Sequence, residues 1–302
     1  MQASSHYAMF ITDLVRRSVS FDWETGMRKL LFLLALGLSV TCGCARTVPA
    51  ETPAVSPAKE LPGVQSLELI IVYDNNPFDN RLLASWGFSC LIRLPQETIL
   101  FDTGGDSSTL LHNMRQLQID PKEVDAIVLS HIHGDHVGGL PGFLKQNSSV
   151  TVYLLKSFPS DFKDEVKSLA ASIEEIQEPR ELFPDVYTTG ELGNGTREQS
   201  LVIRTSRGLV IITGCAHPGI VTIIQRAKDI TRNDAVYLVM GGFHLSGASP
   251  TRIESIINSF EQLTVEKVAP CHCSGEETRQ LFRERYGNDY VESGVGTRIS
   301  LP

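Results

Sequence analysis

Hydrophobic residues along the chain are grouped in short runs, and most of these runs end in polar turns that contain glycine. Runs rich in valine, isoleucine and leucine are typical of buried strands, whereas apolar residues three and four positions apart are typical of helices. From residue 64 onward the two patterns alternate, which indicates a layered α/β domain. We predict strands at 67–73, 87–93, 98–101, 124–129, 150–155, 200–204, 209–213, 235–240, 265–269 and 290–299, and helices at 107–117, 137–145, 161–171, 220–230, 251–263 and 276–286.

Some of the predicted strands are joined by short turns, and others are joined through helices. Pro95-Gln96 and Arg207-Gly208 are the expected turns of two hairpins. A chain that mixes both kinds of connection favours two mixed β-sheets packed between helices, an αββα sandwich. Residues 172–200 are punctuated by proline and glycine, so we predict a long loop there.

The polar segment with the clearest chemistry follows the strand at 124–129 and contains three histidines and an aspartate within the six residues from His131 to His136. Imidazole and carboxylate groups are ligands of zinc, iron and manganese. In an extended segment His131 and His133 point to the same side, so one metal ion can bind both. Asp135 and His136 come after the turn and can reach a second ion.

Other predicted strands also end in residues that can bind metals or transfer protons. In layered α/β proteins, ligands bind at the carboxyl ends of the strands. We therefore expect these residues to gather around the histidine motif. They are Asp102, Cys215, His217, His244 and His272.

The composition narrows the possible partners. The 302 residues are 42% hydrophobic and 21% charged, as in ordinary globular proteins. The net charge of −8 argues against a nucleic-acid-binding surface, which needs a basic stripe. A small anionic substrate remains compatible with this charge, because a pair of divalent ions reverses the local field.

The amino-terminal part differs in composition from the rest. Its first 26 residues have no coherent pattern, and we interpret them as a doubtful leader, with translation expected to begin at Met27. A basic start, an apolar run too short to span a bilayer, and Cys44 then follow in the order of a signal peptide whose cysteine resembles a bacterial lipobox. We expect an exported protein anchored to the cell envelope by lipid at Cys44. The predicted divisions are a leader at 1–26, a signal peptide at 27–44, a proline-rich tether at 45–63 and one domain at 64–302.

The His-x-His-x-Asp-His motif after a strand, followed by Gly-Gly-Leu, resembles the metal signature of the metallo-β-lactamase superfamily. That resemblance implies the αββα fold from about Val64 to the carboxyl terminus. Four local motifs are more specific and resemble the subgroup that contains dihydropterin ribofuranosyl-aminobenzene phosphate synthases and metal-dependent hydrolases. They are Gly-Cys-Ala-His-Pro-Gly-Ile from residue 214, Gly-Gly-Phe-His-Leu from 241, Pro-Cys-His-Cys-Ser-Gly from 270 and Gly-Val-Gly-Thr-Arg-Ile from 294.

The resemblance also suggests how the metal ligands are shared. Relatives supply a further histidine after the motif, but residues 137–214 contain none. The third ligand of the first metal is therefore His217, His244 or a group other than histidine, and we favour His217. His272 resembles the last ligand of the superfamily, which we assign to the second metal with Asp135 and His136.

The sequence leaves more than one role for each of three further residues. Cys215 occupies the place of a bridging aspartate or cysteine in relatives, so it is either a ligand or a buried bystander. Asp102 resembles the aspartate that orients the histidine loop, the alternative being a cap for the helix at 107–117. We expect His244 to act as a proton donor, a substrate contact or a ligand.

These assignments imply a hydrolase with two divalent transition metals, with zinc favoured and iron or manganese as alternatives. A hydroxide between the metals would attack a carbonyl or phosphoryl centre of a small, phosphorylated or ester substrate, while Asp135 also steers the proton. The alternatives are a pterin-type transferase that acts on a pyrophosphate-activated substrate and a non-catalytic metal- or ligand-binding lipoprotein. We expect no nucleic-acid partner and no membrane contact except the lipid anchor.

Overall fold

The structure is a computed structural model that describes residues 63–169 and 172–301. The predicted leader, the predicted signal peptide with Cys44 and all but the last residue of the predicted tether lie outside these described residues. No helix in the described part of the chain is long and apolar enough to cross a membrane.

The first half of the domain builds a seven-stranded mixed sheet with the strand order β13-β1-β2-β3-β4-β5-β6. Strands β1, β2 and β3 pair antiparallel, whereas β3 to β6 pair in parallel, and β13 joins from the carboxyl end of the chain. The strands are β1 (Leu67–Tyr73), β2 (Ser89–Arg93), β3 (Thr98–Phe101), β4 (Ala126–Val128), β5 (Thr151–Leu155), β6 (Ser172–Ile176) and β13 (Arg298–Leu301).

The second half builds a six-stranded mixed sheet with the order β12-β11-β10-β9-β8-β7. Here β10, β11 and β12 are parallel, and β7 to β10 form an antiparallel meander. The strands are β7 (Arg180–Phe183), β8 (Val186–Thr188), β9 (Leu201–Thr205), β10 (Gly208–Thr213), β11 (Val236–Gly242) and β12 (Val265–Cys271).

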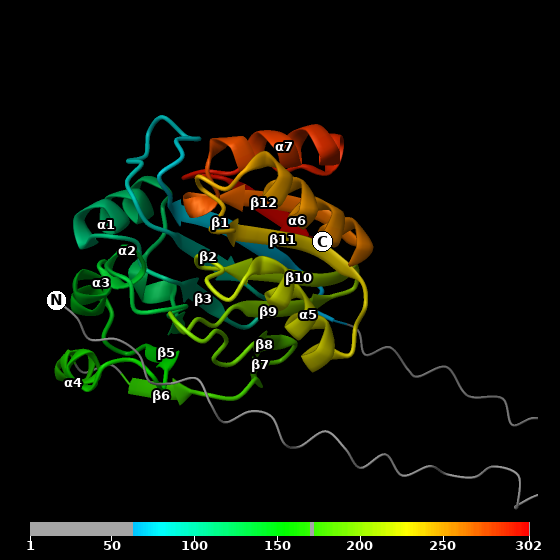
Figure 1. The fold of residues 1–302 in the computed structure, drawn as a ribbon. Helices are drawn as coiled ribbons and strands as arrows, with labels where there is room; N and C mark the ends of the chain where they lie inside the picture. Colours follow the sequence, from blue (N-terminus) through cyan, green and yellow to red (C-terminus); the bar gives the residue numbers. More distant parts are fainter. Residues whose placement is uncertain (1–62, 170–171, 302) are drawn as a thin grey trace, which may run out of the picture. The chain divides into compact units, whose positions relative to one another are not determined.

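Helices cover the outer face of each sheet, so the described domain is the expected αββα sandwich (Figure 1). The helices on the first sheet are α1 (Ser107–Gln116), α2 (Gly134–Val137), α3 (Leu140–Gln146) and α4 (Ser160–Ser168). The helices on the second sheet are α5 (Ile220–Thr231), α6 (Pro250–Gln262) and α7 (Glu276–Tyr286). Short 3-10 turns are η1 (Pro121–Glu123), η2 (His272–Ser274) and η3 (Gly287–Asp289).

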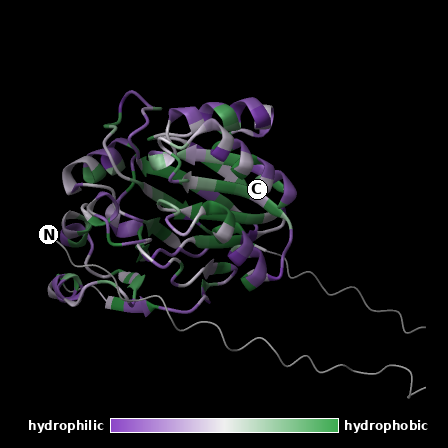
Figure 2. Cartoon of the chain, viewed as in Figure 1, coloured by the Kyte–Doolittle hydropathy of each residue, from purple (hydrophilic) through white to green (hydrophobic). Residues whose placement is uncertain are grey.

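Three apolar layers hold this arrangement together. The central layer joins both sheets and includes Ile71 and Phe101 from the first and Ile203 and Ile212 from the second. Each of the two outer layers joins one sheet to the helices that cover it. Figure 2 shows the hydrophobic colour concentrated along the strands, with hydrophilic residues on the outward sides of the helices. Burial of these apolar surfaces, at about 25 cal/mol per Å² of apolar area, is the main stabilising contribution.

Two sequence predictions of secondary structure were wrong. Residues 172–200 are not a long loop, because β6, β7 and β8 lie within them. Most of β6 is exposed and its sequence is Ser-Ile-Glu-Glu-Ile. Charged edge strands of this kind protect a sheet against unwanted pairing and hide the apolar alternation that marks a strand. The predicted last strand at 290–299 is also displaced, since only Arg298–Leu301 pairs with β1.

The predicted helix at 137–145 is divided into α2 and α3, and α2 begins inside the histidine motif. The division lets the chain pack closely against the loop after β3. A Cβ atom on Gly139 would lie 2.0 Å from the carbonyl oxygen of Thr103. Glycine is therefore required there, and it holds the motif against the end of β3.

Candidate metal centre

The histidine motif begins where β4 ends, beside the end of β3. Asp102, the first residue after β3, is fully buried. Its carboxylate accepts hydrogen bonds from the backbone N–H and the hydroxyl of Ser130, both at 2.7 Å. The same carboxylate lies 2.7 Å from Nδ1 of His136. Asp102 therefore fixes both ends of the motif, whereas the cap of α1 is Asp106.

Three histidines form a first ligand group. One ring nitrogen each of His131, His133 and His217 lies within 4.8 Å of the others. Their ring centroids are 4.6 Å apart for His131 and His133, 4.8 Å for His131 and His217, and 4.9 Å for His133 and His217. The structure thus places His217, rather than His244, beside the two histidines of the motif.

The environment of this first group suits metal ligation. Nε2 of His217 is buried and has no hydrogen-bond partner among the described residues. Burial lowers the pKa of His217 to about 4, with help from the neighbouring His244 and His133. Burial also lowers the pKa of His131, and nearby histidines add to the effect. Neutral imidazoles with a free nitrogen are the form that binds a metal ion, so these residues fit one.

A second ligand group lies next to the first and contains Asp135, His136, Cys215 and His272. Nε2 of His136 is 3.2 Å from the Cys215 sulfur. Oδ2 of Asp135 is 3.6 Å from Nε2 of His136 and 3.3 Å from Nε2 of His272. The pKa of Asp135 lies below its usual range: burial raises it, but the hydrogen bond and charge of His272 and the charge of His136 outweigh burial. A carboxylate, two imidazoles and a thiol are all established ligands of transition metals.

Hydrogen bonds behind this second group orient its imidazoles. Nδ1 of His272 pairs with the side-chain oxygen of Asn75 at 2.9 Å. The backbone N–H of His272 donates to Asp74, which is fully buried. The Asp102 carboxylate pairs in the same way as Asn75, with the ring nitrogen Nδ1 of His136. Such partners select the ring nitrogen that faces the metal, and losing one typically weakens metal affinity about 10–100-fold.

A buried carboxylate that our sequence analysis did not single out supports the loop after β10. Glu198 accepts hydrogen bonds from three consecutive backbone N–H groups, those of Cys215, Ala216 and His217, at 3.0, 2.8 and 2.8 Å. Burial raises the pKa of Glu198 to about 7, although the three donors favour its charged form. No motif marked Glu198, because its role depends on a loop that follows it by 17 residues or more.

His244 belongs to a third group, with Cys215 and Cys273. Its ring lies 4.4 Å from that of His217, and its side chain is exposed. The Cys273 sulfur raises the pKa of His244. The structure therefore places His244 at the rim of the centre, beside two thiols.

The backbone is strained at several of these strand ends. Asp102, Ala216, His244 and His272 have φ values of 58°, 59°, 52° and 47°. Residues other than glycine in this left-handed region cost about 1–2 kcal/mol each relative to a right-handed conformation. Such strain is concentrated at functional sites, where surrounding structure enforces it.

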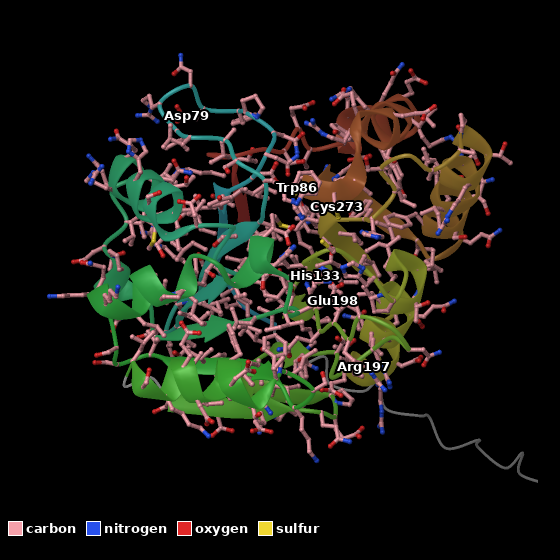
Figure 3. The ribbon with its side chains drawn as sticks, turned by 60° about the vertical axis from the view of Figure 1, so that its left-hand side comes forward. Asp79, Trp86, His133, Arg197, Glu198 and Cys273 are labelled. Carbon is pink, nitrogen blue, oxygen red and sulfur yellow. The ribbon has the colours of Figure 1, made fainter. Side chains whose placement is uncertain are left out.

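An exposed tryptophan lies beside the second ligand group. Trp86, in the segment between β1 and β2, is 57% exposed, and its ring centroid is 4.9 Å from that of His272. Figure 3 shows Trp86, Cys273, His133 and Glu198 in one region of the domain, although they come from distant parts of the chain. An exposed aromatic ring beside a polar centre can stack on a planar substrate.

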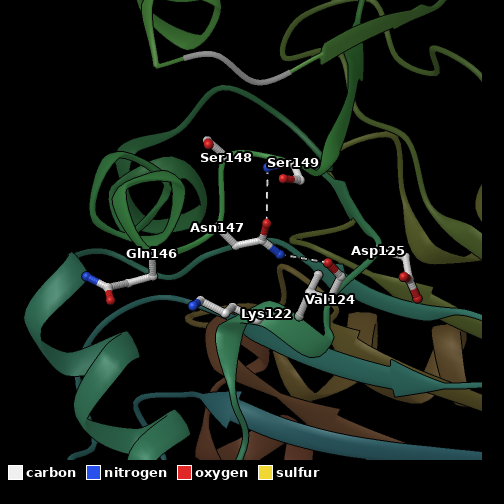
Figure 4. A pocket seen from close by; sticks show the side chains of 7 residues that line it. All are labelled: Lys122, Val124, Asp125, Gln146, Asn147, Ser148 and Ser149. Atoms are coloured by element: carbon white, nitrogen blue, oxygen red, sulfur yellow. Dashed lines mark hydrogen bonds between the residues drawn. The ribbon is translucent and has the colours of Figure 1, made fainter.

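A separate pocket lies near the amino ends of β4 and β5, away from the histidine motif (Figure 4). Asn147 crosses it and donates hydrogen bonds to the carbonyl oxygens of Pro121 and Val124. None of its lining residues belongs to a ligand group. We interpret Asn147 as a structural bridge between η1 and the segment that follows α3.

The chain is similar to known proteins in both sequence and structure. The model of the metallo-beta-lactamase superfamily matches residues 87–272. The chain is 31% identical over 275 residues to the 7,8-dihydropterin-6-methyl-4-(beta-D-ribofuranosyl)-aminobenzene-5'-phosphate synthase of Methanocaldococcus jannaschii, an alignment that covers 75% of this chain and 92% of that protein.

Two solved structures extend the comparison. A metal-dependent hydrolase of the beta-lactamase superfamily has a TM-score of 0.66 and 28% identity, and the match covers 77% of this chain and 98% of that one. The metallo-beta-lactamase fold protein YhfI from Bacillus subtilis has a TM-score of 0.60 with 12% identity, over 78% and 99% of the two chains, and so supports the fold alone. Together with the superfamily match, these similarities establish that the chain belongs to the metallo-beta-lactamase superfamily, whose fold implies the binding of divalent metal ions.

Proposed function

We propose that this protein is a hydrolase with two divalent transition-metal ions, zinc being the favoured metal. The observation that carries the proposal is the pair of adjacent ligand groups, one with three imidazoles and one with a carboxylate, two imidazoles and a thiol. Bound there, divalent ions supply Lewis acidity and lower the pKa of water towards about 7. His131, His133 and His217 would hold the first ion, and Asp135, His136, Cys215 and His272 the second.

The chain's own residues then position the reacting groups. Asp102 fixes His136, and Asn75 fixes His272, so both rings present Nε2 to the centre. The Asp135 side chain is 20% exposed and its carboxylate lies between these two rings. That position allows Asp135 to accept a hydrogen bond from the attacking water and so to steer its proton, while the lowered pKa keeps the carboxylate ionised.

Support for the substrate class comes from the centre and its relatives. Imidazole-rich groups that bind two cations attract an anionic substrate even in a chain with a net charge of −8. A relative at 31% identity is named as the synthase of a phosphorylated product. We propose a small substrate with a phosphoryl or ester bond and no nucleic-acid partner.

A screen of purified protein against phosphodiester, lactone, β-lactam and thioester substrates tests this function. Hydrolysis of at least one class, lost in Asp135→Ala, is the expected result. No hydrolysis by metal-loaded protein across the panel would contradict the proposal.

The similarity to a protein named as the synthase of a dihydropterin compound favours a second candidate. This candidate is a pterin-type transferase that acts on a pyrophosphate-activated substrate. Metal ions held by the same ligand groups would then stabilise the pyrophosphate leaving group. Pyrophosphate release that requires both a pterin diphosphate and an aromatic acceptor would identify the transferase. Release of pyrophosphate or phosphate without an acceptor would identify the hydrolase.

The proposed location is the bacterial cell envelope, through a lipid anchor at Cys44. The basic, apolar and cysteine-containing order of residues 27–44 supports it. Mass spectrometry of membrane-extracted protein is expected to show an acylated amino-terminal Cys44. A soluble protein that begins at Met1 would contradict this location.

A further inference from the structure

Two buried thiols and an exposed imidazole lie together beside the second ligand group. The donor atoms of Cys215, His244 and Cys273 are all within 4.8 Å of one another. Cys215 and Cys273 are each 4% exposed, and the Cys273 thiol lies 3.7 Å from the carbonyl oxygen of Cys215. The three residues come from the loops after β10, β11 and β12, three parallel neighbours in the second sheet.

The backbone is shaped to bring these side chains together. A Cβ atom on Gly242 would lie 2.6 Å from the Cys273 sulfur and 3.2 Å from the Cα atom of Cys215. Only glycine leaves room for the sulfur at that position. His244, two residues later, has a φ of 52°, a conformation unfavourable for histidine. The closely packed glycine and the strained histidine next to two thiols indicate that the fold maintains this arrangement at a cost in conformational free energy.

The donor set differs in chemistry from both neighbouring groups. Two thiolates with one imidazole favour softer metals than three imidazoles or a set with a carboxylate. Zinc takes thiolate sulfur at about 2.3 Å and imidazole nitrogen at about 2.0–2.1 Å, so tetrahedral ligands lie about 3.5–3.8 Å apart. The donor atoms all lie within 4.8 Å of one another, so side-chain rotations have to shorten these separations by about 1 Å at most. The exposed side of His244 provides an entry path from solvent.

The other described cysteines lack these features. Cys90 lies fully buried in the apolar layer between the sheets. Burial alone raises its pKa to about 12. Cys271 is also fully buried and belongs to none of the ligand groups. Free thiols in the apolar core behave as small hydrophobic residues, in contrast to the pair beside His244.

We propose that Cys215, His244 and Cys273 form a third metal position for a soft divalent ion, such as zinc or cadmium, and that Cys215 is shared with the second group. Binding displaces the thiol protons and forms bonds from two sulfurs and one nitrogen to the ion. Three protein ligands leave one coordination position open to solvent or substrate. The proposal goes beyond hydrolysis, and its test needs no substrate.

Cadmium titration of reduced, chelator-treated full-length protein tests the proposal. Metal bound per chain is measured by elemental analysis, and thiolate coordination by the ultraviolet sulfur-to-cadmium band. Cys273→Ser is expected to lose about one equivalent of the ion and about half of the band, because one of two thiolates is removed. His244→Ala is expected to lose the same equivalent. Cys215→Ser should lose that equivalent and also weaken binding at the second group.

Cys90→Ala is the matched control, since it removes a buried thiol elsewhere, and it should leave stoichiometry and band unchanged. A Cys273→Ser protein that binds as much cadmium as the wild type would overturn the third position. Alkylation of the wild-type protein gives a second measurement that does not depend on a folded variant. Because Cys273 is 4% exposed, the reagent reaches it only when the structure opens locally. Cadmium should slow this reaction, and an equal alkylation rate at Cys273 with and without cadmium would also refute the proposal.

Discussion

Replacement of Glu198 tests whether this carboxylate holds the loop that supplies ligands to all three groups. Glu198 is fully buried and accepts three backbone N–H groups from Cys215, Ala216 and His217. Glu198→Gln keeps the volume and one acceptor oxygen, but it turns an amide N–H₂ towards a backbone donor. The substitution therefore perturbs the position of the loop without opening a cavity.

The magnitude follows from the hydrogen bonds. A buried polar group left without a partner costs about 1–3 kcal/mol. Glu198→Gln leaves the N–H of His217 facing another donor, so we expect a loss of about 1–3 kcal/mol in the free energy of unfolding. Glu198→Ala leaves three donors without the carboxylate, and we expect a loss of about 3–6 kcal/mol, somewhat less than three separate penalties because water can enter the space. Displacement of His217 should also weaken metal binding at the first group by about 10–100-fold.

Urea unfolding of the metal-free protein and competition with a chromophoric chelator measure the two effects. Glu191→Gln is a matched control, because Glu191 accepts one backbone N–H, that of Ser157, on an exposed loop. We expect the control to change stability by less than about 0.5 kcal/mol. Equal stability and equal metal affinity in Glu198→Gln and the wild type would refute the reasoning.

Further substitutions test individual parts of the account. Asp102→Asn should lower metal affinity at the second group about 10–100-fold, because the buried carboxylate that orients His136 is lost. Unchanged affinity in chelator competition would show that Asp102 is not needed for metal binding. Trp86→Ala should raise KM about 2–10-fold with little change in kcat if the ring stacks on substrate, whereas an unchanged KM would exclude that contact. His217→Ala should release the first metal ion and abolish hydrolysis, and full metal content measured by elemental analysis would show that His217 is not a ligand.

The sequence predicted well those helices and strands whose apolar residues follow a clear local pattern. Strands β1 and β3 and helix α7 were predicted with their observed bounds. Each has a strong local signal, such as the apolar run Leu-Glu-Leu-Ile-Ile-Val-Tyr of β1. The edge strands β6 and β7 were missed, because their charged and partly exposed residues carry no clear period. Pairing with a neighbouring strand, rather than local sequence, makes them strands.

The residues of the candidate centre could also be predicted only in part. Residues of the motif at 131–136 could be proposed from spacing alone, because ligands close in sequence are close in space. The choice between His217 and His244 could not be made from sequence, because both follow strands and glycines. In the structure His217 lies beside His131, and His244 lies beside Cys273. Glu198 carried no local signal, since its partners are backbone groups of a distant loop.

The most direct test of the central claim is an anomalous-difference map from crystals of the purified protein, collected at the absorption edge of the metal that it contains. The account predicts one peak among His131, His133 and His217 and another among Asp135, His136, Cys215 and His272. These two ions occupy adjacent positions, as in other two-metal centres, and a further peak at Cys215, His244 and Cys273 would mark the third position proposed above. A map in which at least one of the two groups has no peak after metal loading would contradict it.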